Sequence, residues 1–319
     1  MVAGQPTRAK PPAGPLGRWR GTVAKDFRRN KVVYLILSPI LLYYVIFNYI
    51  PMNGIVMAFQ RYSPGLGIWR SPFVGLTHFK NFFGGYFFLP LLRNTFLISF
   101  YNLLFGFPAP ILLALLFNEL RTKSFKKLVQ TVTYIPNFIS TVVIVGIARI
   151  LLRPDGVINY IAGWFGAGTL NFLAVPGYFR TILISIDILQ GVGYGTVIYL
   201  AAIASLGTEI YEAAMIDGAG RWKQAIHLTL PGLVPTITIL LIFRIASLLS
   251  VGTEKILLLY NDATLSTADV IGTYVYRKGL VDLNYSFASA VGLLNSVVSM
   301  VLLAVSNQVA KFAGDTSLW

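Results

Sequence analysis

The sequence predicts an all-α fold, a polytopic membrane helical bundle with about six transmembrane helices. Apolar residues make up 55% of the 319 residues and charged residues only 12%, whereas a soluble domain carries about 25% charged residues. The apolar residues also form blocks that are about as long as a bilayer is thick. These blocks lack the polar faces that the outer helices of a soluble helical protein need.

Six apolar blocks are long enough to cross about 30 Å of hydrocarbon at about 1.5 Å per helical residue. We expect the first block to end near Pro51. Pro108 and Pro110 fall inside the second block, where neighbouring helices can satisfy the freed backbone groups. The predicted spans are 32–50, 95–117, 131–152, 181–205, 232–251 and 287–309.

The first 31 residues differ in composition from the rest of the chain. They contain four prolines, eight Lys or Arg residues and one acidic residue, Asp26. Because such a segment cannot bury a core, we expect residues 1–31 to form a basic cytoplasmic N-terminal arm. Residues 32–319 would then form the transmembrane domain.

The distribution of basic residues predicts the orientation of the spans. With the N-terminus inside, the inner segments hold 15 Lys or Arg residues and the longer outer segments hold nine. The short inner segment 118–130 alone carries four of them. Both termini are therefore predicted to lie in the cytoplasm. The net charge of +14 is explained by contact with a lipid bilayer, and no nucleic-acid module is present.

The predicted outer segments, about 60–94, 153–180 and 252–286, are long for simple connections. The first carries nine aromatic residues, among them Tyr62, Trp69 and Phe82. Such a cluster is typical of an aromatic belt at the membrane interface or of a short re-entrant helix. The same residues would also suit a docking surface for an external protein.

Residues 206–231 predict a cytoplasmic helix–turn–helix between two spans. Thr208 is a good N-cap, and residues 209–217 form a first short helix that Gly218 ends, because glycine can adopt a left-handed conformation. Residues 221–229 form a second short helix, which Pro231 ends.

The first of these helices combines small and acidic side chains. Ala213 and Ala214 would let another protein's backbone approach closely, and three acidic residues surround them: Glu209, Glu212 and Asp217. A small surface with an acidic rim suits insertion into a cleft with basic walls.

The spacing in this segment resembles the EAA loop of the permeases of ABC importers. That loop reads Glu-Ala-Ala, three residues, Gly, nine residues, Ile, one residue and Leu-Pro. Here the matching positions are Glu212, Ala213, Ala214, Gly218, Leu230 and Pro231. Leu228 stands where the family usually has Ile, which is a mild departure.

The resemblance extends over most of residues 32–319 and is closest to polysaccharide and oligosaccharide permeases of the LplB type. Within this group, one specific candidate is a permease subunit of an alginate importer. The matching segments are Tyr49–Met52, Ala58–Phe59, Gly67–Trp69, Phe73–Leu76, Tyr285–Leu293 and Ser317–Trp319.

This resemblance implies the transmembrane domain of a type I ABC importer in a bacterial inner membrane. It implies a second, homologous permease as partner in a heterodimer, two cytoplasmic ATPase subunits and an external solute-binding protein. The loop with Glu209, Glu212, Ala213, Ala214, Asp217 and Gly218 would couple this chain to the ATPases. ATP and Mg²⁺ would bind to those partners, and we expect no cofactor on this chain.

Three ionisable residues fall within the predicted spans: Arg149, Asp187 and Arg244. Each costs about 2.5–3.5 kcal/mol at mid-bilayer, so such groups usually face the bundle interior or a cavity. Gln190 and Tyr194 share a helical face with Asp187. These five residues are candidates for the path of an oligo- or polysaccharide, and the arginines would suit a uronate. The alternatives are a structural ion pair of Asp187 with Arg149 or Arg244, and an Arg149 side chain that reaches the headgroups.

Several other classes of protein lack support in the sequence. There is no cysteine, there are two histidines, and neither a phosphate-binding loop nor a catalytic triad is present. The chain is therefore expected to be a non-catalytic transport subunit. A self-contained secondary transporter or channel remains the alternative, and dependence on partner proteins would separate the two.

Overall fold

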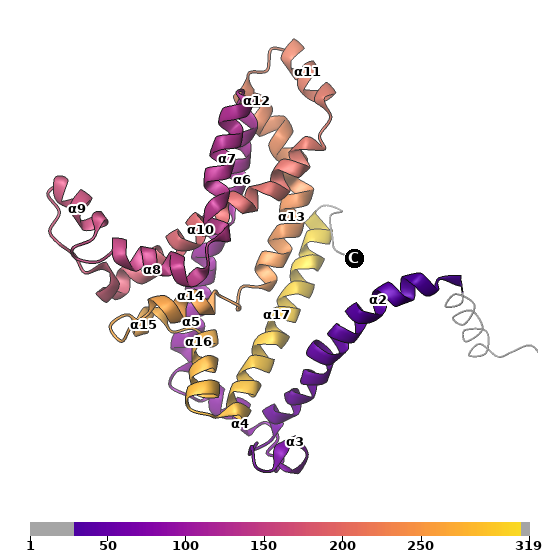
Figure 1. The fold of residues 1–319 in the computed structure, drawn as a ribbon, viewed down its shortest axis with the longest axis vertical. Coiled ribbons are helices and arrows are strands. Elements are labelled where there is room, and N and C mark those ends of the chain that lie inside the picture. Colours follow the sequence, from indigo (N-terminus) through magenta and orange to yellow (C-terminus); the bar gives the residue numbers. More distant parts are fainter. Residues whose placement is uncertain (1–28, 314–319) are drawn as a thin grey trace, which may run out of the picture. The chain divides into compact units, whose positions relative to one another are not determined.

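The computed structural model describes residues 29–313, which form helices and the connections between them (Figure 1). Within these residues no β-strand forms, and one isolated bridge joins Gln60 to Phe73. The predicted all-α fold is therefore confirmed. Most of the predicted N-terminal arm, residues 1–28, lies outside the described residues. The chain divides into two compact units, Met1–Val56 and Met57–Trp319, each of which is described by itself.

The first unit is one helical run made of α2 (Lys31–Tyr44), η1 (Val45–Tyr49) and the beginning of η2 (Ile50–Phe59). The run is apolar and 29 residues long, enough to cross a membrane. Its predicted end near Pro51 is wrong. The turn before Pro51 is a π-helix and the turns after it are 3-10 helical. The change in hydrogen-bond spacing compensates for the backbone amide proton that proline lacks.

The second unit contains four further helices or helical runs that are long and apolar enough to cross a membrane. They begin earlier than the predicted spans do. The four are α5–η3–α6 (Phe88–Tyr101, Asn102–Gly106, Pro108–Glu119), α10 (Pro176–Ala204), α12–η5–α13 (Arg221–Gln224, Ala225–Thr229, Leu230–Ala246) and α17 (Tyr285–Ala313).

The predicted span 131–152 is a bent pair of helices, not one straight helix. α7 (Lys123–Phe138) and α8 (Thr141–Leu151) meet at an angle of 102°. Pro136 lies in the last turn of α7, and Ser140 caps α8 by accepting a hydrogen bond from the Val143 amide. A proline followed by an N-cap is a strong signal for a break. With this pair counted as one span, the described residues contain six candidate spans, as predicted.

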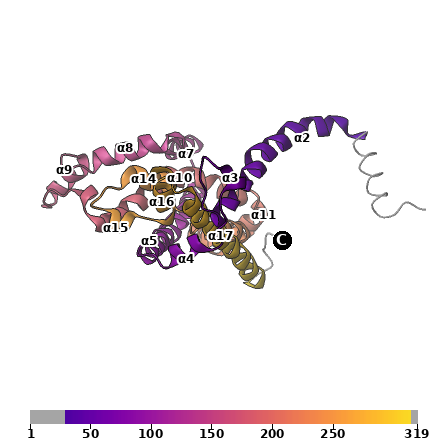
Figure 2. The same cartoon turned by 90° about the horizontal axis from the view of Figure 1, so that it is seen from below.

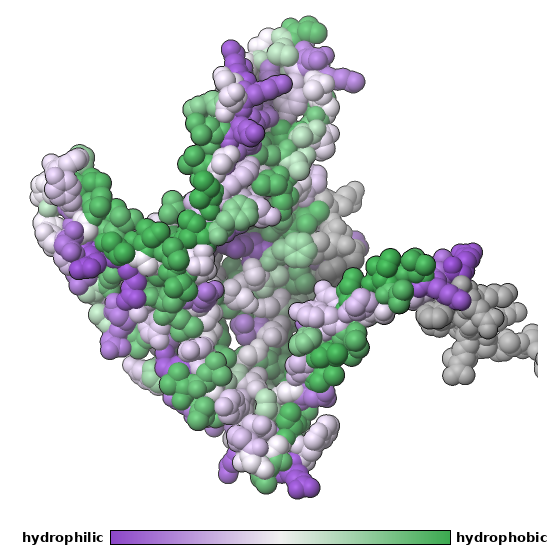
Figure 3. All heavy atoms as spheres, in the orientation of Figure 1, coloured by the Kyte–Doolittle hydropathy of each residue, from purple (hydrophilic) through white to green (hydrophobic). Residues whose placement is uncertain are grey.

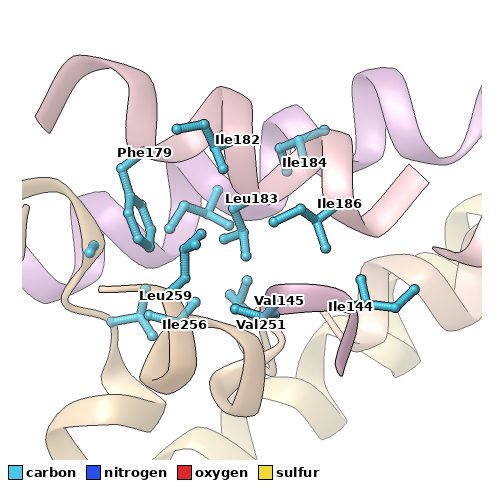
Figure 4. Packing of buried hydrophobic residues seen from close by; sticks show 13 residues of the cluster. Ile144, Val145, Phe179, Ile182, Leu183, Ile184, Ile186, Val251, Ile256 and Leu259 are labelled. Atoms are coloured by element: carbon cyan, nitrogen blue, oxygen red, sulfur yellow. The ribbon is translucent and has the colours of Figure 1, made fainter. Parts of the chain in front are cut away.

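α10 lies at the centre of the second unit and supplies much of its largest apolar core. Phe179, Leu183 and Ile186 of α10 face Ile256 of α14 (Thr253–Leu259) and side chains of α8 across this core (Figure 4). α10 also packs on α6 and α7 along its second half. Because α10 contacts so many elements, part of its polar surface, including Asp187 and Gln190, is partly buried inside the unit.

Gly193 of α10 marks a close approach between two helices. A Cβ built on Gly193 would overlap the carbonyl oxygen of Thr133 in α7. No other residue type fits at this position without separating the two backbones.

Short helices fill the three predicted outer segments. α14 packs against α8, α10 and α16, as the view in Figure 2 also shows. The remaining short elements are α3 (Gly67–Arg70), α4 (Thr77–Phe83), α9 (Val157–Trp164), η4 (Phe172–Ala174), α15 (Leu265–Ala268), α16 (Ile271–Tyr276) and η6 (Arg277–Val281).

The aromatic residues of segment 60–94 divide into two groups. Phe82 of α4 is buried against Tyr274 and Phe287 in a small aromatic core. Trp69 and Tyr86, by contrast, are 86% and 87% exposed. The buried group joins α4 to α16 and α17, and the exposed group is free to meet lipid or another molecule.

The second unit has two distinct ends. α11 (Thr208–Ile216) and α12 lie at one end, and α4, α16 and the start of α17 lie at the other (Figure 1). Hydrophilic residues gather around α11 and α12, and hydrophobic residues cover much of the helices that lead away from them (Figure 3). This distribution is typical of a bundle that crosses a bilayer with α11 on one side.

Candidate functional site

The principal candidate site is a cavity of about 610 Å³ on the face of α10 that meets η3, α6 and α13. Its lining includes three charged residues and one amide, which come from four different elements. Asn102 comes from η3, Asp187 from α10, Arg244 from α13 and Lys255 from α14. We refer to these residues as the polar tetrad and to the space as the tetrad cavity.

Asn102 lies at the centre of the tetrad. Its side-chain nitrogen Nδ2 donates a hydrogen bond to Asp187 Oδ2 over 2.8 Å. Its oxygen Oδ1 accepts a hydrogen bond from Arg244 Nη2. The amide of Asn102 therefore orients the Asp187 carboxylate and the Arg244 guanidinium together. Asn102 is the first residue of the π-helical turn η3, and such turns are frequent at functional sites.

Lys255 completes the tetrad from the segment 252–286, which was predicted to lie on the outer side. Its Nζ lies 2.5 Å from Asp187 Oδ1, and both side chains are 18% exposed. The structural ion pair considered for Asp187 therefore exists, but its partner is Lys255 and not Arg149 or Arg244. One carboxylate balances one of two cations, so the tetrad carries a formal net charge of +1. An uncompensated positive charge in a partly buried cavity favours binding of an anion.

Of the five residues predicted to line the substrate path, two line this cavity: Asp187 and Arg244. Gln190 instead donates a hydrogen bond from Nε2 to Ile139 O over 3.1 Å, at the bend between α7 and α8. Tyr194 is 53% exposed and meets the ring of Phe138 edge to face.

Arg149 lies apart from the tetrad cavity. Its Nη1 donates a hydrogen bond over 3.2 Å to Leu258 O in α14, so it holds α8 to α14. Asn102 and Lys255 were not predicted as site residues. Asn102 is a polar residue inside an apolar block, which is a usable signal. The sequence contains no such signal for Lys255, because Lys255 reaches Asp187 from a segment 68 residues away.

α11 is the second candidate site, and its helix was predicted closely. It runs from Thr208 to Ile216, with Gly207, not Thr208, at the N-cap. At its end the Gly218 amide bonds to Met215 O and the Ala219 amide bonds to Ala214 O. These two bonds form a Schellman motif, and Gly218 has the positive φ of +74° that the motif requires.

The predicted coupling residues lie mostly on the surface of this element. Ala214 is half-buried, and the others are exposed: Glu209, Glu212, Ala213, Asp217 and Gly218. Large apolar side chains accompany the acidic ones, since Ile216 is 86% exposed and Trp222 is 78% exposed. Exposed apolar residues beside charges are characteristic of a protein-binding surface.

The second helix of the predicted helix–turn–helix does not end at Pro231. α12, η5 and α13 form one continuous run from Arg221 to Ala246. In the π-helical η5 the Leu230 amide bonds to Ala225 O, five residues back. Pro231 then falls in the first turn of α13, where its missing amide proton is tolerated.

Hydrogen bonds attach α11 to this continuous helix. The hydroxyl of Tyr211 lies 3.0 Å from Oγ1 of Thr229, which is 1% exposed. Gln224 Nε2 donates to Ala219 O over 2.7 Å across the turn. A force on α11 would therefore be transmitted directly to α13.

The described part of the chain shows no candidate metal centre. Residues 29–313 contain no cluster of three or more His, Asp or Glu side chains that could hold a metal ion. The polar tetrad instead has the composition of a binding site.

Comparison with known proteins identifies a family of transport components. Residues 106–311 match the family described as the binding-protein-dependent transport system inner membrane component. The matched region contains the α11 loop and three of the four tetrad residues. Asn102 lies just before it.

Two curated relatives from Bacillus subtilis (strain 168) are similar to this chain over most of its length. Protein LplB is 44% identical over 285 residues, which cover 89% of this chain and 90% of LplB. The polygalacturonan/rhamnogalacturonan transport system permease protein YteP is 42% identical over 292 residues, which cover 91% of each chain.

Solved structures show the same relationship. A chain of a bacterial ABC transporter involved in the import of the acidic polysaccharide alginate matches with a TM-score of 0.85 and 41% identity, covering 91% of this chain and 98% of that one. A bacterial alginate ABC transporter in complex with an alginate pentasaccharide-bound periplasmic protein matches equally well, covering 92% and 99%.

Proposed function

Because the chain belongs to the family of binding-protein-dependent transport system inner membrane components, we propose that it is a permease subunit of an ATP-driven importer for an acidic oligo- or polysaccharide. The observation that carries the cargo assignment is the tetrad cavity, whose two cations face one carboxylate. The similarity to YteP and to the alginate importer supports this class of cargo.

The chain would form half of the translocation path, and a second, homologous permease would supply the other half. An external solute-binding protein would deliver the saccharide, as the alginate-importer complex with its periplasmic protein suggests. The tetrad cavity lies on an open face of α10, and the second permease would cover that face.

α11 would be the coupling helix. Its acidic and apolar surface, with Glu209, Glu212 and Ile216, suits a cleft on a cytoplasmic ATPase subunit. Two such subunits would hydrolyse ATP with Mg²⁺, and this chain would bind neither. Closure of the ATPases would move α11, and the Tyr211–Thr229 hydrogen bond would pass that movement to α13 and Arg244.

The coupling role fixes the orientation. α11 and both termini would lie in the cytoplasm, and α4, α14 and α16 would lie on the outer side of a bacterial inner membrane. The end of α10 that begins at Pro176 is then the outer end.

Purification of the tagged chain from its native membranes tests the proposal. We expect a second permease, an ATPase and a solute-binding protein to co-purify. The reconstituted complex should take up an alginate oligosaccharide only when ATP is inside the liposomes. Uptake by liposomes that contain this chain alone, without ATP, would instead identify a self-contained transporter.

A further inference from the structure

A second cavity, of about 550 Å³, lies on α10 closer to its beginning at Pro176. Arg180, Thr181 and Ser185 of α10 line it, together with Tyr101 of α5 and Phe105 of η3. We call this space the Arg180 pocket. It adjoins the tetrad cavity, because Ile188 lines both.

Arg180 is held in a fixed position. Its Nη2 donates a hydrogen bond over 2.8 Å to Asn94 Oδ1. The Nδ2 atom of Asn94, which is 4% exposed, donates to the carbonyl oxygens of Ser266 and Asp269 over 2.9 and 3.0 Å. The orientation of the guanidinium is therefore set by a buried amide with all its partners in place, which makes Arg180 a preorganised cation.

No acid among residues 29–313 neutralises this cation. Arg180 forms no ion pair with any residue in the range that the structure describes. Its Nε is buried and has no hydrogen-bond partner in the same range. Arg93 of α5 adds a second positive charge that repels Arg180. A guanidinium with an unused buried donor requires an acceptor, and the acceptor that it binds best is a carboxylate or phosphate.

The rest of the pocket matches a sugar better than a phosphate ion. The hydroxyls of Thr181 and Ser185 can exchange hydrogen bonds with sugar hydroxyls. The rings of Tyr101 and Phe105 stack with their centroids 6.5 Å apart and offer apolar faces to a pyranose ring. The pocket thus combines a cation, hydroxyls and aromatic rings next to the tetrad cavity.

We propose that the Arg180 pocket is a binding subsite for a carboxylate group of an acidic saccharide, occupied before the saccharide reaches the tetrad cavity. The assignment rests on the proposed function for the identity of the ligand. The positive potential of the pocket and its accessibility are properties that can be measured without transport.

The absence of cysteine from the sequence allows a direct test. Ser185→Cys places one thiol in the pocket of the complete importer in liposomes. The rates of modification by a sulfonate-bearing and a trimethylammonium-bearing methanethiosulfonate then report the local charge. We expect the anionic reagent to react faster. Adding Arg180→Gln should lower the anionic-to-cationic rate ratio by about tenfold, and Arg180→Lys should largely preserve it.

Arg153→Gln serves as the matched control. Arg153 lies in the outer segment 153–180, is exposed and pairs with Asp155, so its loss should leave the rate ratio at position 185 unchanged. A ratio that Arg180→Gln does not alter would overturn the proposal. So would a thiol that neither reagent reaches, because the partner permease would then cover the pocket.

The identity of the ligand is tested by measuring which molecules protect the same thiol from modification. Binding protein loaded with alginate pentasaccharide should slow modification at least about threefold, and a neutral pentasaccharide should not. The experiment is run in phosphatidylcholine with and without phosphatidylglycerol. Protection by phosphatidylglycerol alone would overturn the saccharide assignment in favour of a lipid headgroup. If protection occurs but uptake does not, the proposed function fails and the subsite stands.

Discussion

Asn102 and Asp187 are joined by a hydrogen bond of 2.8 Å between Nδ2 and Oδ2, although they lie on different spans. The same amide accepts a hydrogen bond from Arg244. Two opposite charges inside the bundle are therefore held apart by one neutral side chain, and Lys255 takes the remaining carboxylate oxygen. The arrangement leaves Arg244 without a carboxylate of its own in the described residues.

The ion pair in the tetrad predicts coupled losses of stability. Asp187→Asn or Lys255→Gln leaves one charge unpaired in a partly buried cavity, which costs about 1–3 kcal/mol. The double variant should lose less than the sum of the two single variants. Thermal unfolding of the purified importer measures the three midpoints. Strictly additive shifts would show that the pair contributes nothing.

The cargo path is tested by replacing a charged side chain with a neutral polar one. Arg244→Gln should raise the KM for uptake of an acidic oligosaccharide by roughly tenfold, the value of one charge-assisted hydrogen bond. Arg149→Gln is the matched control, since Arg149 bonds Leu258 O away from the cavity. If Arg244→Gln and Asp187→Asn both left uptake unchanged in the reconstituted importer, the tetrad cavity would not be on the path.

Tyr211→Phe should uncouple ATP hydrolysis from uptake. The substitution removes only the hydroxyl that meets Thr229, worth about 0.5–1.5 kcal/mol. We expect a roughly two- to tenfold fall in sugar imported per ATP hydrolysed, with ATPase activity retained. Tyr160→Phe, on the exposed helix α9, is the control. Equal falls in transport and ATPase activity would indicate lost assembly instead.

Gly218→Pro should abolish ATP-driven uptake while leaving membrane insertion intact. Proline requires φ near −65°, whereas Gly218 has φ of +74°, so the Schellman motif at the end of α11 cannot form. Gly207→Ala is a milder companion variant at the other end of the helix. Insertion is followed by membrane fractionation and uptake by radiolabelled sugar. Normal uptake in Gly218→Pro would exclude α11 as the coupling element.

Asp269→Asn should destabilise the end of the second unit that contains α16 by about 2 kcal/mol. Arg277 donates to Asp269 over 2.6 and 3.3 Å, and this hydrogen bond raises the pKa of Arg277 above its ordinary value. Arg277 therefore stays charged and loses its partner in the variant. The unfolding midpoint of Asp282→Asn provides the control, because that acid is paired with Lys278 at the surface. Equal shifts would contradict the assigned difference in burial.

The spans were predictable because about 20 consecutive apolar residues have few other stable environments. Their ends were less predictable. Pro51 and Pro231 lie inside continuous helices, since π-helical turns next to them change the hydrogen-bond spacing. After Pro136, by contrast, the helix breaks and the chain bends. The outcome depends on neighbours such as Gln190, which satisfies the carbonyl oxygen of Ile139 at the bend.

The α11 loop was predictable from spacing alone, because its helix, its glycine and its acidic residues are adjacent in sequence. The tetrad was not. Lys255 reaches Asp187 from 68 residues away, and hydropathy assigns it to an outer segment. Arg180 lies just before the predicted span 181–205, so it was not counted among the intramembrane charges.

Gly193 has a mechanical consequence for any importer built from this chain. Since the carbonyl oxygen of Thr133 in α7 occupies the space where a side chain at position 193 would lie, α7 and α10 pack more closely here than any larger residue would allow. We therefore expect α7 and α10 to move together, as one rigid element, when such an importer alternates between its two states.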